Sequence, residues 1–533
     1  MAHAKTATRE VRSVSVFVLL FVLLFLLHLG LLRLPYFWDE AGHYVPAARD
    51  LLLTGSLIPH STPSNAHPPL VMAYLALWWK AVGYTLIVTR TAMLFVASFA
   101  LLGVFRLARR AANVEVAIAA TICTALYPVF FVQSSLAHVD LAAAGLTFWG
   151  LLAYVENRRI ATVLWFSLAV LAKETAVLAP LSLFAWELLR PFLRIRDGSE
   201  WRRMFLRRRW NSTLLLVSLA PLLLWYWFHY SRTGFVFGNP EFFRYNVQAT
   251  LHPLRVLLAL LMRLWQTFGY LNLWMLTLAA LLAMWKPPLY DANGERPRIA
   301  LETQLAFFFV TAPYVFTMAF IGGAVLARYM LPIVPLVIIV WVSTLWRRVG
   351  QWRAVVAIVA GAFAIGLFVN PPYGFSFEDT LAYRDYIVLH QHADAFIEAR
   401  CPMARVLTAW PANDELTRPY LAYVTRPVRV VRIEDFSAEQ VMSAAEARSE
   451  FDVALVFSTK YEPPRPLVRR WPAWDEMKMR FFGYHRDLPP LVAAQMLDGE
   501  IVFSEARNGQ WVSVIELHHI VNASRHSVFP NGL

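Results

Sequence analysis

The sequence predicts an α-helical membrane protein of about eleven spans, followed by a small α/β domain. Hydrophobic residues make up 58% of the 533-residue chain, whereas soluble domains are about 45–50% apolar. Apolar runs recur as far as about residue 370, and the composition changes after that point. The 20 Trp, 20 Tyr and 37 Phe also suit the aromatic belts that form at membrane surfaces.

The first apolar run directly follows a basic N-terminus. It exceeds the core of a signal peptide and lacks a small-x-small cleavage site, so we expect it to remain as an anchor. Most of the later runs approach the length of a membrane-spanning helix, and several are shorter. The expected spans are residues 14–34, 88–107, 114–135, 139–155, 160–172, 175–190, 211–230, 268–286, 300–321, 326–346 and 353–370.

Basic residues gather in every second connection between these spans. Because basic loops stay in the cytoplasm, the N-terminus and these connections are expected inside. An odd number of spans then places the chain after residue 370 outside, in the periplasm or the extracellular space. The membrane itself is expected to be a bacterial inner (plasma) membrane. The basic connections are residues 106–110, 156–159, 190–210, 286–298 and 347–353.

The change of composition divides the chain into a membrane domain, residues 1–370, and an extracytoplasmic domain, residues 371–533. In the second domain, short β-branched runs alternate with helical patterns, which is typical of a small α/β fold. The expected strands are residues 405–410, 428–433, 452–457 and 511–517.

Several classes of function find no support in the sequence. It contains no P-loop, no glycine-rich dinucleotide fingerprint and no Cys/His spacing typical of a zinc site. Its two cysteines, Cys123 and Cys401, make no disulfide framework. The formal charge of +13 is explained by the topology and by anionic lipid headgroups. We therefore expect membrane lipids, and no nucleic acid, among the partners.

Ionisable residues gather at the expected outer ends of separate spans. Charges at a bilayer boundary are costly unless they stay wet or serve a function. Their common level predicts one pocket at the membrane–water boundary, facing away from the cytoplasm. The residues are the acids Asp39, Glu40, Asp140 and Glu174 and the bases His67, Arg90, Lys173 and Arg328.

Motifs ordered along residues 1–370 resemble the polyprenyl-phosphate-dependent GT-C glycosyltransferases, especially bacterial relatives of the protein mannosyltransferases and of the lipid A aminoarabinose transferase. LAKET replaces the commoner Lys-Gly-Pro of that family, and the tail carries none of its motifs. The matching motifs are YFWDEAGHY (36–44), HPPL (67–70), TRTAMLF (89–95), HVDLAAAG (138–145), LAKETAVLAPL (171–181) and ARYMLPIVP (327–335).

The resemblance implies a hexosyl- or pentosyltransferase that works at the outer face of the membrane. It would move a sugar from a polyprenyl phosphate, or a related lipid carrier, to a glycan, lipid or protein acceptor. Such a transfer needs a base at the acceptor, cations at the leaving phosphate and a groove for the lipid tail.

Asp39 and Asp140 match acidic positions of the family, and Glu40 is the neighbour of Asp39. Asp39 is the candidate general base, although Asp39 and Glu40 could instead cap the following helix in water. Glu40 could also bind a metal, hold Asp39 in place or simply face solvent. Asp140 could orient the acceptor, or share a divalent cation such as Mg²⁺ or Mn²⁺ with Asp39, or serve only at the start of a helix, where acids are favoured.

The remaining candidates would bind substrate. Cations near the phosphate stabilise the charge that develops on the leaving oxygens. Each residue also has a structural alternative: a histidine at a helix start, an arginine or tyrosine anchored at the interface, or a lysine paired with nearby acids. The candidates are His67 for acceptor or phosphate, His138 for joining Asp140 at the acceptor or a divalent cation, Arg90, Lys173 and Arg328 for phosphate, and Tyr329 for the lipid.

Two other functions remain open from the sequence. A transporter or flippase of a lipid-linked glycan should carry ionisable residues near mid-bilayer in two related halves; Arg263 and Glu302 are such residues, but the halves look unlike. An anchored binding protein would act through its tail, for which eleven spans are excessive.

Overall fold

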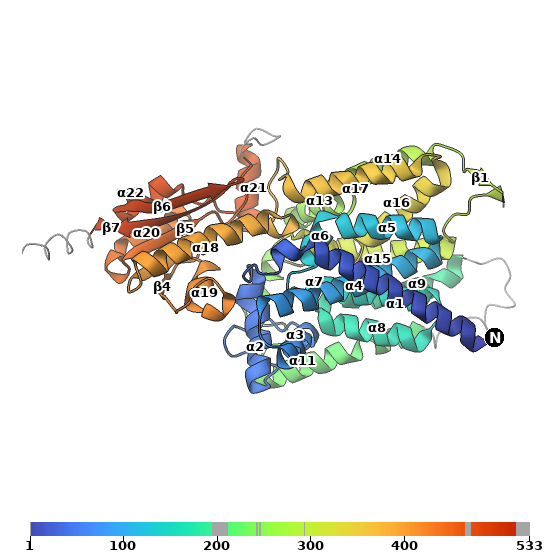
Figure 1. Cartoon of the computed structure of the whole chain (residues 1–533), viewed down its shortest axis with the longest axis horizontal. Helices are drawn as coiled ribbons and strands as arrows, with labels where there is room; N and C mark the ends of the chain where they lie inside the picture. Colours follow the sequence, from blue (N-terminus) through green and yellow to red (C-terminus); the bar gives the residue numbers. More distant parts are fainter. Residues whose placement is uncertain are drawn as a thin grey trace, which may run out of the picture. The chain divides into compact units, whose positions relative to one another are not determined.

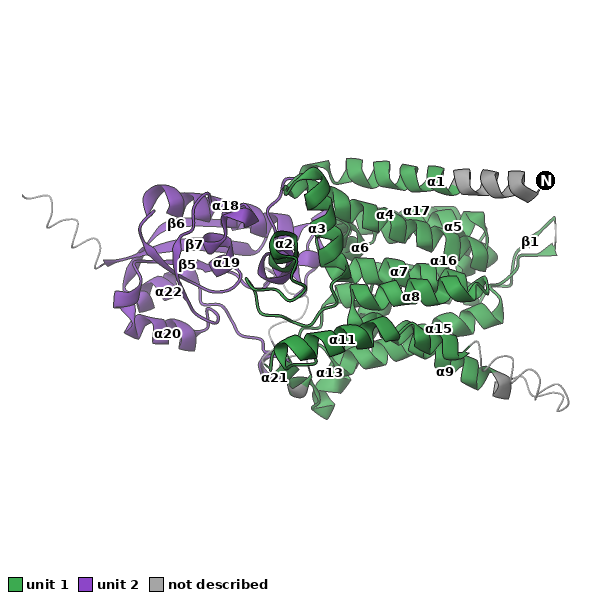
Figure 2. Ribbon diagram, turned by 90° about the horizontal axis from the view of Figure 1, so that it is seen from below, with its two compact units in different colours: residues 1–32, 46–367 green, residues 33–45, 368–533 purple. Residues whose placement is uncertain are grey.

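The computed structural model describes residues 2–193, 212–240, 243–244, 247–292, 294–463 and 471–518. They form two compact units, shown in green and purple in Figure 2. Unit 1 comprises residues 1–32 and 46–367, and unit 2 comprises residues 33–45 and 368–533. Most of the basic connection predicted at residues 190–210 lies outside the described residues.

Unit 1 is almost entirely helical (Figure 1). A short hairpin, β1 (Tyr290–Asp291) with β2 (Gly294–Glu295), interrupts the helices. The helices are α1 (Ala2–Leu27), α2 (Val45–Thr54), α3 (Leu70–Val82), α4 (Leu86–Ala111), α5 (Val114–Leu126), α6 (Pro128–Gln133), α7 (Val139–Val155), α8 (Arg159–Ala172), α9 (Leu178–Leu193), α11 (Ala220–Thr233), α13 (Pro253–Phe268), α14 (Leu273–Met284), α15 (Leu301–Phe320), α16 (Val334–Arg348) and α17 (Trp352–Phe368).

Several of these helices are suited to cross a membrane. Within the described residues, three are both long and apolar enough: Leu86–Ala111, Ser212–Thr233 and Leu301–Phe320. Helices α13 and α14 meet the same test as a pair bent by 76°. Shorter apolar helices of 10–17 residues, such as α7 and α8, accompany them. Unit 1 is therefore a polytopic helical membrane unit, whereas eleven spans and their orientation remain predictions.

Helix α7 lies at the centre of unit 1, packed against α4 and α8. Small side chains permit this close packing. A Cβ atom added to Gly145 would lie 2.8 Å from Cβ of Ala100 on α4. One added to Gly150 would lie 2.6 Å from the Phe166 ring on α8. Close packing thus fixes the middle of α7, whose first turn carries Asp140.

The structure differs from the sequence prediction around residue 268. The predicted span 268–286 corresponds to α14, but α13 precedes it in a segment that was expected to be a connection. Arg255 and Arg263 lower the hydropathy of this segment, which hid the helix. Both arginines are buried in the protein, while Leu257 and Leu261 of the same helix are exposed, as expected for a helix with one face toward lipid.

Unit 2 is an α/β fold with a mixed five-stranded sheet in the order β4-β3-β5-β7-β6. Strand β3 pairs in parallel with β4 and β5, and β7 pairs antiparallel with β5 and β6. The elements are α18 (Ala382–Arg400), β3 (Arg405–Thr408), α19 (Ala412–Thr417), β4 (Arg429–Arg432), α20 (Ala438–Glu446), β5 (Val453–Phe457), α21 (Pro472–Phe482), α22 (Pro490–Leu497), β6 (Gly499–Arg507) and β7 (Gln510–Leu517).

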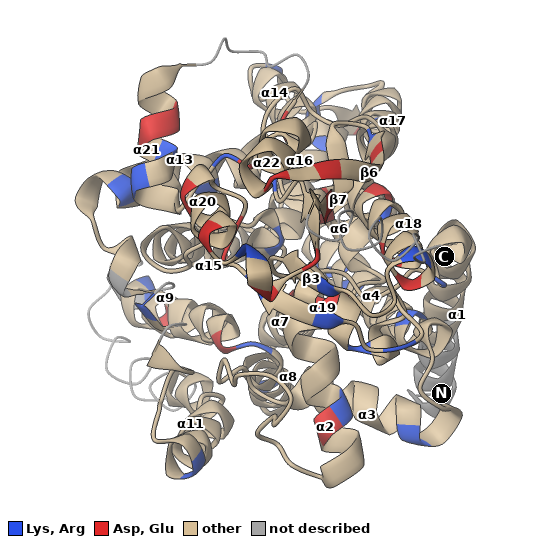
Figure 3. Ribbon diagram, turned by 90° about the vertical axis from the view of Figure 1, so that its left-hand side faces the viewer, with Lys and Arg blue, Asp and Glu red and all other residues tan. Residues whose placement is uncertain are grey.

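Four of these strands occur where the β-branched runs predicted them, and β6 is additional. In β5 every residue is buried, whereas β6 lies at an edge of the sheet and alternates between half-buried and exposed residues. An edge strand with polar residues such as Glu500 and Ser504 carries a weak sequence signal. Figure 3 shows both acidic and basic residues on α21, while α7 and α8 of unit 1 are mostly uncharged.

Candidate active site

An ion cluster joins three segments of unit 1 that are distant in the sequence. Lys173 ends α8, and its Nζ lies 2.5 Å from Oδ1 of Asp140 in the first turn of α7. Nε of Arg328, in the short helix Ala327–Met330, lies 3.3 Å from Oδ2 of Asp140. All three side chains are almost completely buried. One carboxylate thus pairs with two cations. For Lys173, this pairing with a nearby acid is the structural alternative to a role in binding phosphate.

The ring of Tyr329 brings a third cation to this cluster. The distances to its ring centroid are 4.0 Å from Lys173 Nζ, 5.7 Å from Arg328 Cζ and 5.5 Å from Arg263 Cζ. Cations within about 6 Å of an aromatic ring centroid are attracted to its face. The ring of Tyr329 is therefore a common neighbour of all three cations.

Arg263 reaches this cluster from α13. Its guanidinium donates hydrogen bonds to the carbonyls of Met318 (3.1 Å) and Leu326 (2.7 Å). A third bond, of 2.8 Å, goes to Oε1 of Gln266. Among the described residues it makes no ion pair, and its buried Nη2 has no hydrogen-bond partner. Arg263 is thus the cation of the cluster that lacks a protein carboxylate.

His138 and Arg90 support the segment that leads into α7. Arg328 Nη1 lies 3.1 Å from Nδ1 of His138. The same Nδ1 lies 2.8 Å from Oε1 of Gln133, so His138 links Gln133 to Arg328. Arg90 of α4 is buried and donates to the carbonyl of Ser135 at 3.0 Å. His138 thus belongs to the cluster, and Arg90 holds the backbone behind it.

His67 is positioned by the residue that follows Lys173. Its Nδ1 lies 3.0 Å from Oε2 of Glu174. The loop that carries His67 is held from the other side, since Trp225 Nε1 donates to the carbonyl of Ala66 at 2.9 Å. The extended backbone of Lys173 (φ −153°, ψ 136°) ends α8, and the next residue, Glu174, holds His67.

Asp39 and Glu40 belong to unit 2. Glu40 is fully buried, and its Oε2 accepts the backbone N–H of Phe37 at 2.9 Å, so the alternative that Glu40 faces solvent is wrong. Asp39 is half-buried at the start of a π-helical turn, Glu40–Tyr44, and makes no capping hydrogen bond to it. The adjacent acids therefore have different environments: Glu40 is buried and bonded to the loop backbone, whereas Asp39 is half-buried.

Within unit 2, residues from the C-terminal part of the chain contact the loop that carries Asp39. The Tyr36 N–H donates to the Leu421 carbonyl at 3.4 Å, and the Tyr423 hydroxyl donates to the Tyr36 carbonyl at 3.1 Å. Trp410 packs edge-on against Trp38. The position of Asp39 is consequently set by residues far along the sequence.

The comparisons with known proteins identify the fold. No family model and no curated protein matches the sequence. The structure is similar to that of ArnT from Cupriavidus metallidurans bound to undecaprenyl phosphate: the TM-score is 0.54 at 15% identity, over 94% of this chain and 97% of ArnT. Against the apo state of ArnT, the TM-score is 0.51 at 14% identity, over 96% and 98%.

This chain has the GT-C fold. The resemblance inferred from the ordered motifs is therefore confirmed. Archaeal AglB from Archaeoglobus fulgidus, in complex with an inhibitory peptide and a dolichol-phosphate, is less similar, with a TM-score of 0.44 at 12% identity over 95% of this chain and 74% of AglB. The fold does not favour a transporter over a glycosyltransferase.

The GT-C unit of this chain offers no fit for a divalent cation at Asp140. Both oxygens of its carboxylate face cations, Lys173 and Arg328, and a metal ion there would be repelled by them. Within the part of the chain that the structure describes, no group of three or more His, Cys, Asp or Glu side chains is placed to hold a metal. We therefore derive no chemical step through a metal.

Sequence reasoning did not include Arg255, Arg263 and Gln266 among the site residues. All three are buried on one face of α13. Arg255 donates to the carbonyls of Gly322 (2.8 Å) and Gly323 (3.2 Å), which anchors the segment before Arg328. The available signal was two arginines within an apolar stretch, since ionisable residues in membrane helices usually face protein and serve a function.

Proposed function

We propose that this GT-C protein is a glycosyltransferase that moves a hexosyl or pentosyl group from a polyprenyl-phosphate donor to an acceptor at the outer face of the membrane. The acceptor would be a glycan, a lipid or a protein. One observation carries the proposal: three buried cations, Lys173, Arg263 and Arg328, surround Tyr329, and Asp140 is the carboxylate that pairs with two of them.

The charge of this cluster favours an anionic ligand. A buried ion costs several kcal/mol unless another charge or several hydrogen bonds compensate it. Asp140 serves Lys173 and Arg328, while the Nη2 atom of Arg263 has no hydrogen-bond partner among the described residues. A phosphate oxygen would supply that partner, and arginine is well suited to bind phosphate through paired N–H groups.

In the proposed reaction, Asp39 acts as the general base. It takes the proton of the acceptor hydroxyl or amine while that group attacks the anomeric carbon of the donor sugar. The bond from this carbon to the phosphate oxygen breaks, and the lipid phosphate leaves with the electron pair. Lys173, Arg263 and Arg328 stabilise the negative charge that develops on the phosphate. A positioned general base typically contributes about 10²–10⁴ to the rate.

The other candidates would act around this step. We assign His67 to the acceptor, with Glu174 as the residue that positions it, and His138 and Arg90 to the support of the phosphate site. Tyr329 would hold the cations in place and contact the lipid. The basic connections would lie in the cytoplasm. The N-terminus is therefore proposed to lie on the cytoplasmic side of a bacterial inner membrane, and unit 2 in the periplasm.

Transfer can be tested with the purified full chain in proteoliposomes. These would contain lipids extracted from cell envelopes as donors and delipidated envelope material as acceptor. Release of free polyprenyl phosphate, measured by mass spectrometry, reports the reaction. We expect release with the native protein and at least about 10²-fold less with Asp39→Asn. Glu434→Gln, a change of an exposed acid in unit 2, is the matched control and should retain release.

Two results would contradict the proposal. Movement of intact sugar–lipid across the bilayer, without release of polyprenyl phosphate, would identify a flippase. Native-like turnover of folded, membrane-inserted Asp39→Asn would remove Asp39 from the role of base.

A further inference from the structure

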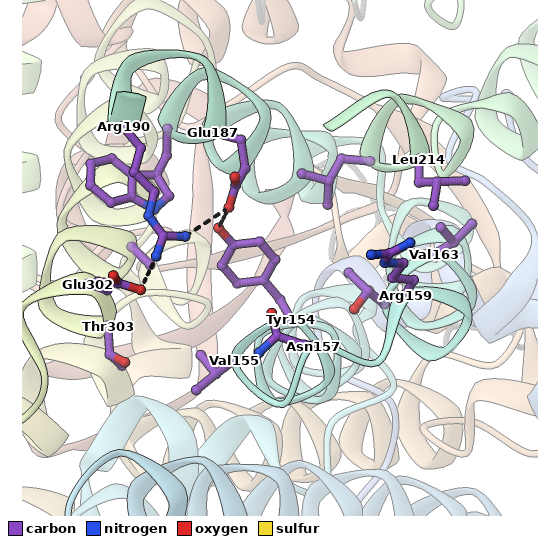
Figure 4. Close-up of a pocket in the computed structure, with 14 residues that line it drawn as sticks. Tyr154, Val155, Asn157, Arg159, Val163, Glu187, Arg190, Leu214, Glu302 and Thr303 are labelled. Atoms are coloured by element: carbon purple, nitrogen blue, oxygen red, sulfur yellow. Dashed lines mark hydrogen bonds and ion pairs between the residues drawn. The ribbon is translucent and has the colours of Figure 1, made fainter. Parts of the chain in front are cut away.

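Figure 4 shows a cavity of about 330 Å³ in unit 1, lined mainly by residues of α7, α8, α9 and α15. Arg190 contacts both Glu187 and Glu302 there, and the Tyr154 hydroxyl donates to Glu187. Because these side chains already bind one another, their charges do not specify a ligand. Unit 2 offers a clearer case, in the aromatic residues around the proposed base, Asp39.

Trp38 and Trp410 form an aromatic pair in unit 2. Their ring centroids lie 5.0 Å apart, with an angle of 76° between the ring planes. Both tryptophans are half-buried. The buried Tyr386 of α18 packs edge-on against Trp38, at 5.7 Å between centroids. The pair therefore rests on the core of unit 2 and keeps part of its surface accessible.

The side chain of Trp38 leaves one polar group without a protein partner. Within the described ranges of the chain, Trp38 makes ring contacts but no side-chain hydrogen bond. Its indole N–H is a donor only, whereas the ionised carboxylate of the next residue, Asp39, is an acceptor only. Two consecutive residues thus carry a donor, an acceptor and an apolar ring.

The backbone of Trp38 adopts a conformation that is unfavourable for tryptophan. Its φ is 49°, in the left-handed region that residues other than glycine rarely adopt. The Gly42 N–H donates to the Trp38 carbonyl at 2.9 Å, and a Cβ atom at Gly42 would lie 2.8 Å from Nε1 of Trp410. Strain of this kind persists where the surrounding structure enforces it, and it is common at ligand sites.

Trp410 lies at the edge of the sheet where α/β domains usually bind ligands. Strand β3 ends at Thr408, two residues before Trp410. It pairs in parallel with β4, the next strand in the sequence, on one side and with β5 on the other. In open sheets, ligands bind outside the carboxyl ends of the strands where the strand order reverses in this way. The position of the pair therefore favours a ligand site.

We propose that the Trp38–Trp410 pair binds a sugar ring of the acceptor, so that the acceptor is a carbohydrate. A sugar ring has apolar C–H groups on its faces, which suit an indole ring, and hydroxyls at its edge, which both donate and accept hydrogen bonds. One hydroxyl would accept from Nε1 of Trp38, and the attacking hydroxyl would donate to Asp39. This inference rests on the proposed function, in which Asp39 takes the acceptor proton.

Other ligands fit these residues less well. A hydrocarbon chain would pack against the rings but would leave the indole N–H unsatisfied. A cation would be attracted to the ring faces but could not accept the hydrogen bond that the N–H offers. The sugar of the donor also has ring faces and hydroxyls, and kinetics distinguish it from a sugar of the acceptor.

Binding of simple sugars tests this site without transfer. The purified full chain, in a detergent that has no sugar groups, is mixed with methyl glycosides of glucose, galactose, N-acetylglucosamine and arabinose, and with sorbitol, which has hydroxyls but no ring. Saturation-transfer NMR should show contact with the C–H groups of at least one glycoside and not with sorbitol. Trp38→Gly should abolish this contact, because glycine adopts the positive φ without strain while the ring is removed. Trp471→Ala, a change of an exposed tryptophan outside the pair, is the matched control and should keep it.

Kinetics in the proteoliposome assay test the assignment to the acceptor. Trp38→Gly should raise the amount of envelope acceptor needed for half-maximal release of polyprenyl phosphate by about tenfold or more, and should leave the donor requirement unchanged. Trp38→Phe keeps an aromatic face but lacks the N–H, so its acceptor requirement should lie between those of the native protein and Trp38→Gly. Unfolding of the loop would not produce such a graded series.

Three results would overturn the inference: native-like glycoside contact or acceptor requirement in Trp38→Gly, equal contact with sorbitol and the glycosides, or a change confined to the donor requirement. Failure of the proposed function would look different. In that case glycoside contact would still depend on Trp38, but the native chain would release no polyprenyl phosphate.

Discussion

The ammonium group of Lys173 lies 2.5 Å from Oδ1 of Asp140, and both side chains are buried. The same carboxylate faces Arg328 at 3.3 Å. Asp140 is therefore the counter-ion that permits two cations to be buried at the end of α7. Because these residues belong to one charge network, a substitution of any of them changes the environment of the others.

Asp140→Asn should destabilise the protein strongly. Breaking a buried ion pair costs about 3–5 kcal/mol, because the partner charge remains buried. The apparent Tm of the full chain in detergent should fall, and Lys173→Met in the same chain should recover part of the loss. A double variant no more stable than Asp140→Asn would show that the two residues are not coupled.

Arg263→Gln should weaken binding of the lipid phosphate. Loss of a charge-assisted hydrogen bond of about 1.5–3 kcal/mol corresponds to roughly 10- to 160-fold in Kd. Arg263→Lys should retain part of the affinity, since it keeps the charge but loses the fork. The measurement is the rise in apparent Tm on adding undecaprenyl phosphate. An undiminished rise in Arg263→Gln would exclude Arg263 from the phosphate site.

Arg328→Ala should impair use of the donor more than use of the acceptor. The expected signature is a larger change in the donor KM, or in kcat at saturating acceptor, than in the acceptor KM. Because Arg328 also faces Asp140, the apparent Tm must be measured alongside. Unchanged donor KM and kcat in a folded variant would count against the assignment.

Gly42→Ala should disturb the loop that carries Asp39. A Cβ atom at Gly42 would lie 2.8 Å from Nε1 of Trp410, a contact that requires one of the two to move. Overpacking of this kind costs about 1–3 kcal/mol. Limited proteolysis should cut within residues 33–45 faster than in the native chain. Trp410→Phe, which removes the clashing nitrogen, should partly restore resistance; if it does not, the clash is not the cause.

Three buried groups should make the stability of unit 2 depend on pH. Burial raises the pKa of Asp394 and of Glu415 well above the usual range and lowers the pKa of His390 to about 4. His390 Nδ1 lies 2.6 Å from Glu415 Oε2, and these opposite shifts indicate a hydrogen bond between neutral groups. Both oxygens of Asp394 lack a hydrogen-bond partner among the described residues.

The sign of the effect follows from these directions. The two carboxyls are protonated in the folded state, so their contribution is complete at low pH and is lost as pH rises toward their raised pKa values. His390 is neutral when folded, so its contribution is lost as pH falls from about 6.5 toward about 4.

Asp394→Asn should therefore reduce the loss of stability at rising pH. Each such group contributes up to about 1.4 kcal/mol per pH unit. The apparent Tm of the full chain, measured as pH rises above the usual range of carboxyl pKa values, should fall less steeply in the variant than in the native chain. Glu439→Gln, an exposed acid on α20, is the control. Identical slopes in all three proteins would contradict the prediction.

The sequence determined the elements with strong periodicity and the fold to which they belong. The span predicted at residues 139–155 is α7, residue for residue, because a continuous apolar run is a local property. Likewise, the β-branched run at 452–457 contains the buried strand β5. The ordered motifs, rather than any single one, pointed to the GT-C fold, and several of their residues, including Asp140, Lys173 and Arg328, meet in one cluster.

The tertiary structure decided which charged side chains lie close to one another. Arg263 was visible in the sequence as a polar residue in an apolar stretch, but only the packing of α13 brings it to Tyr329. The burial of Glu40 and the packing of Trp410 against Trp38 depend on contacts between residues that are hundreds of positions apart in the sequence. Hydropathy and motif spacing are local along the chain, whereas ion pairing and burial depend on which segments pack together in space.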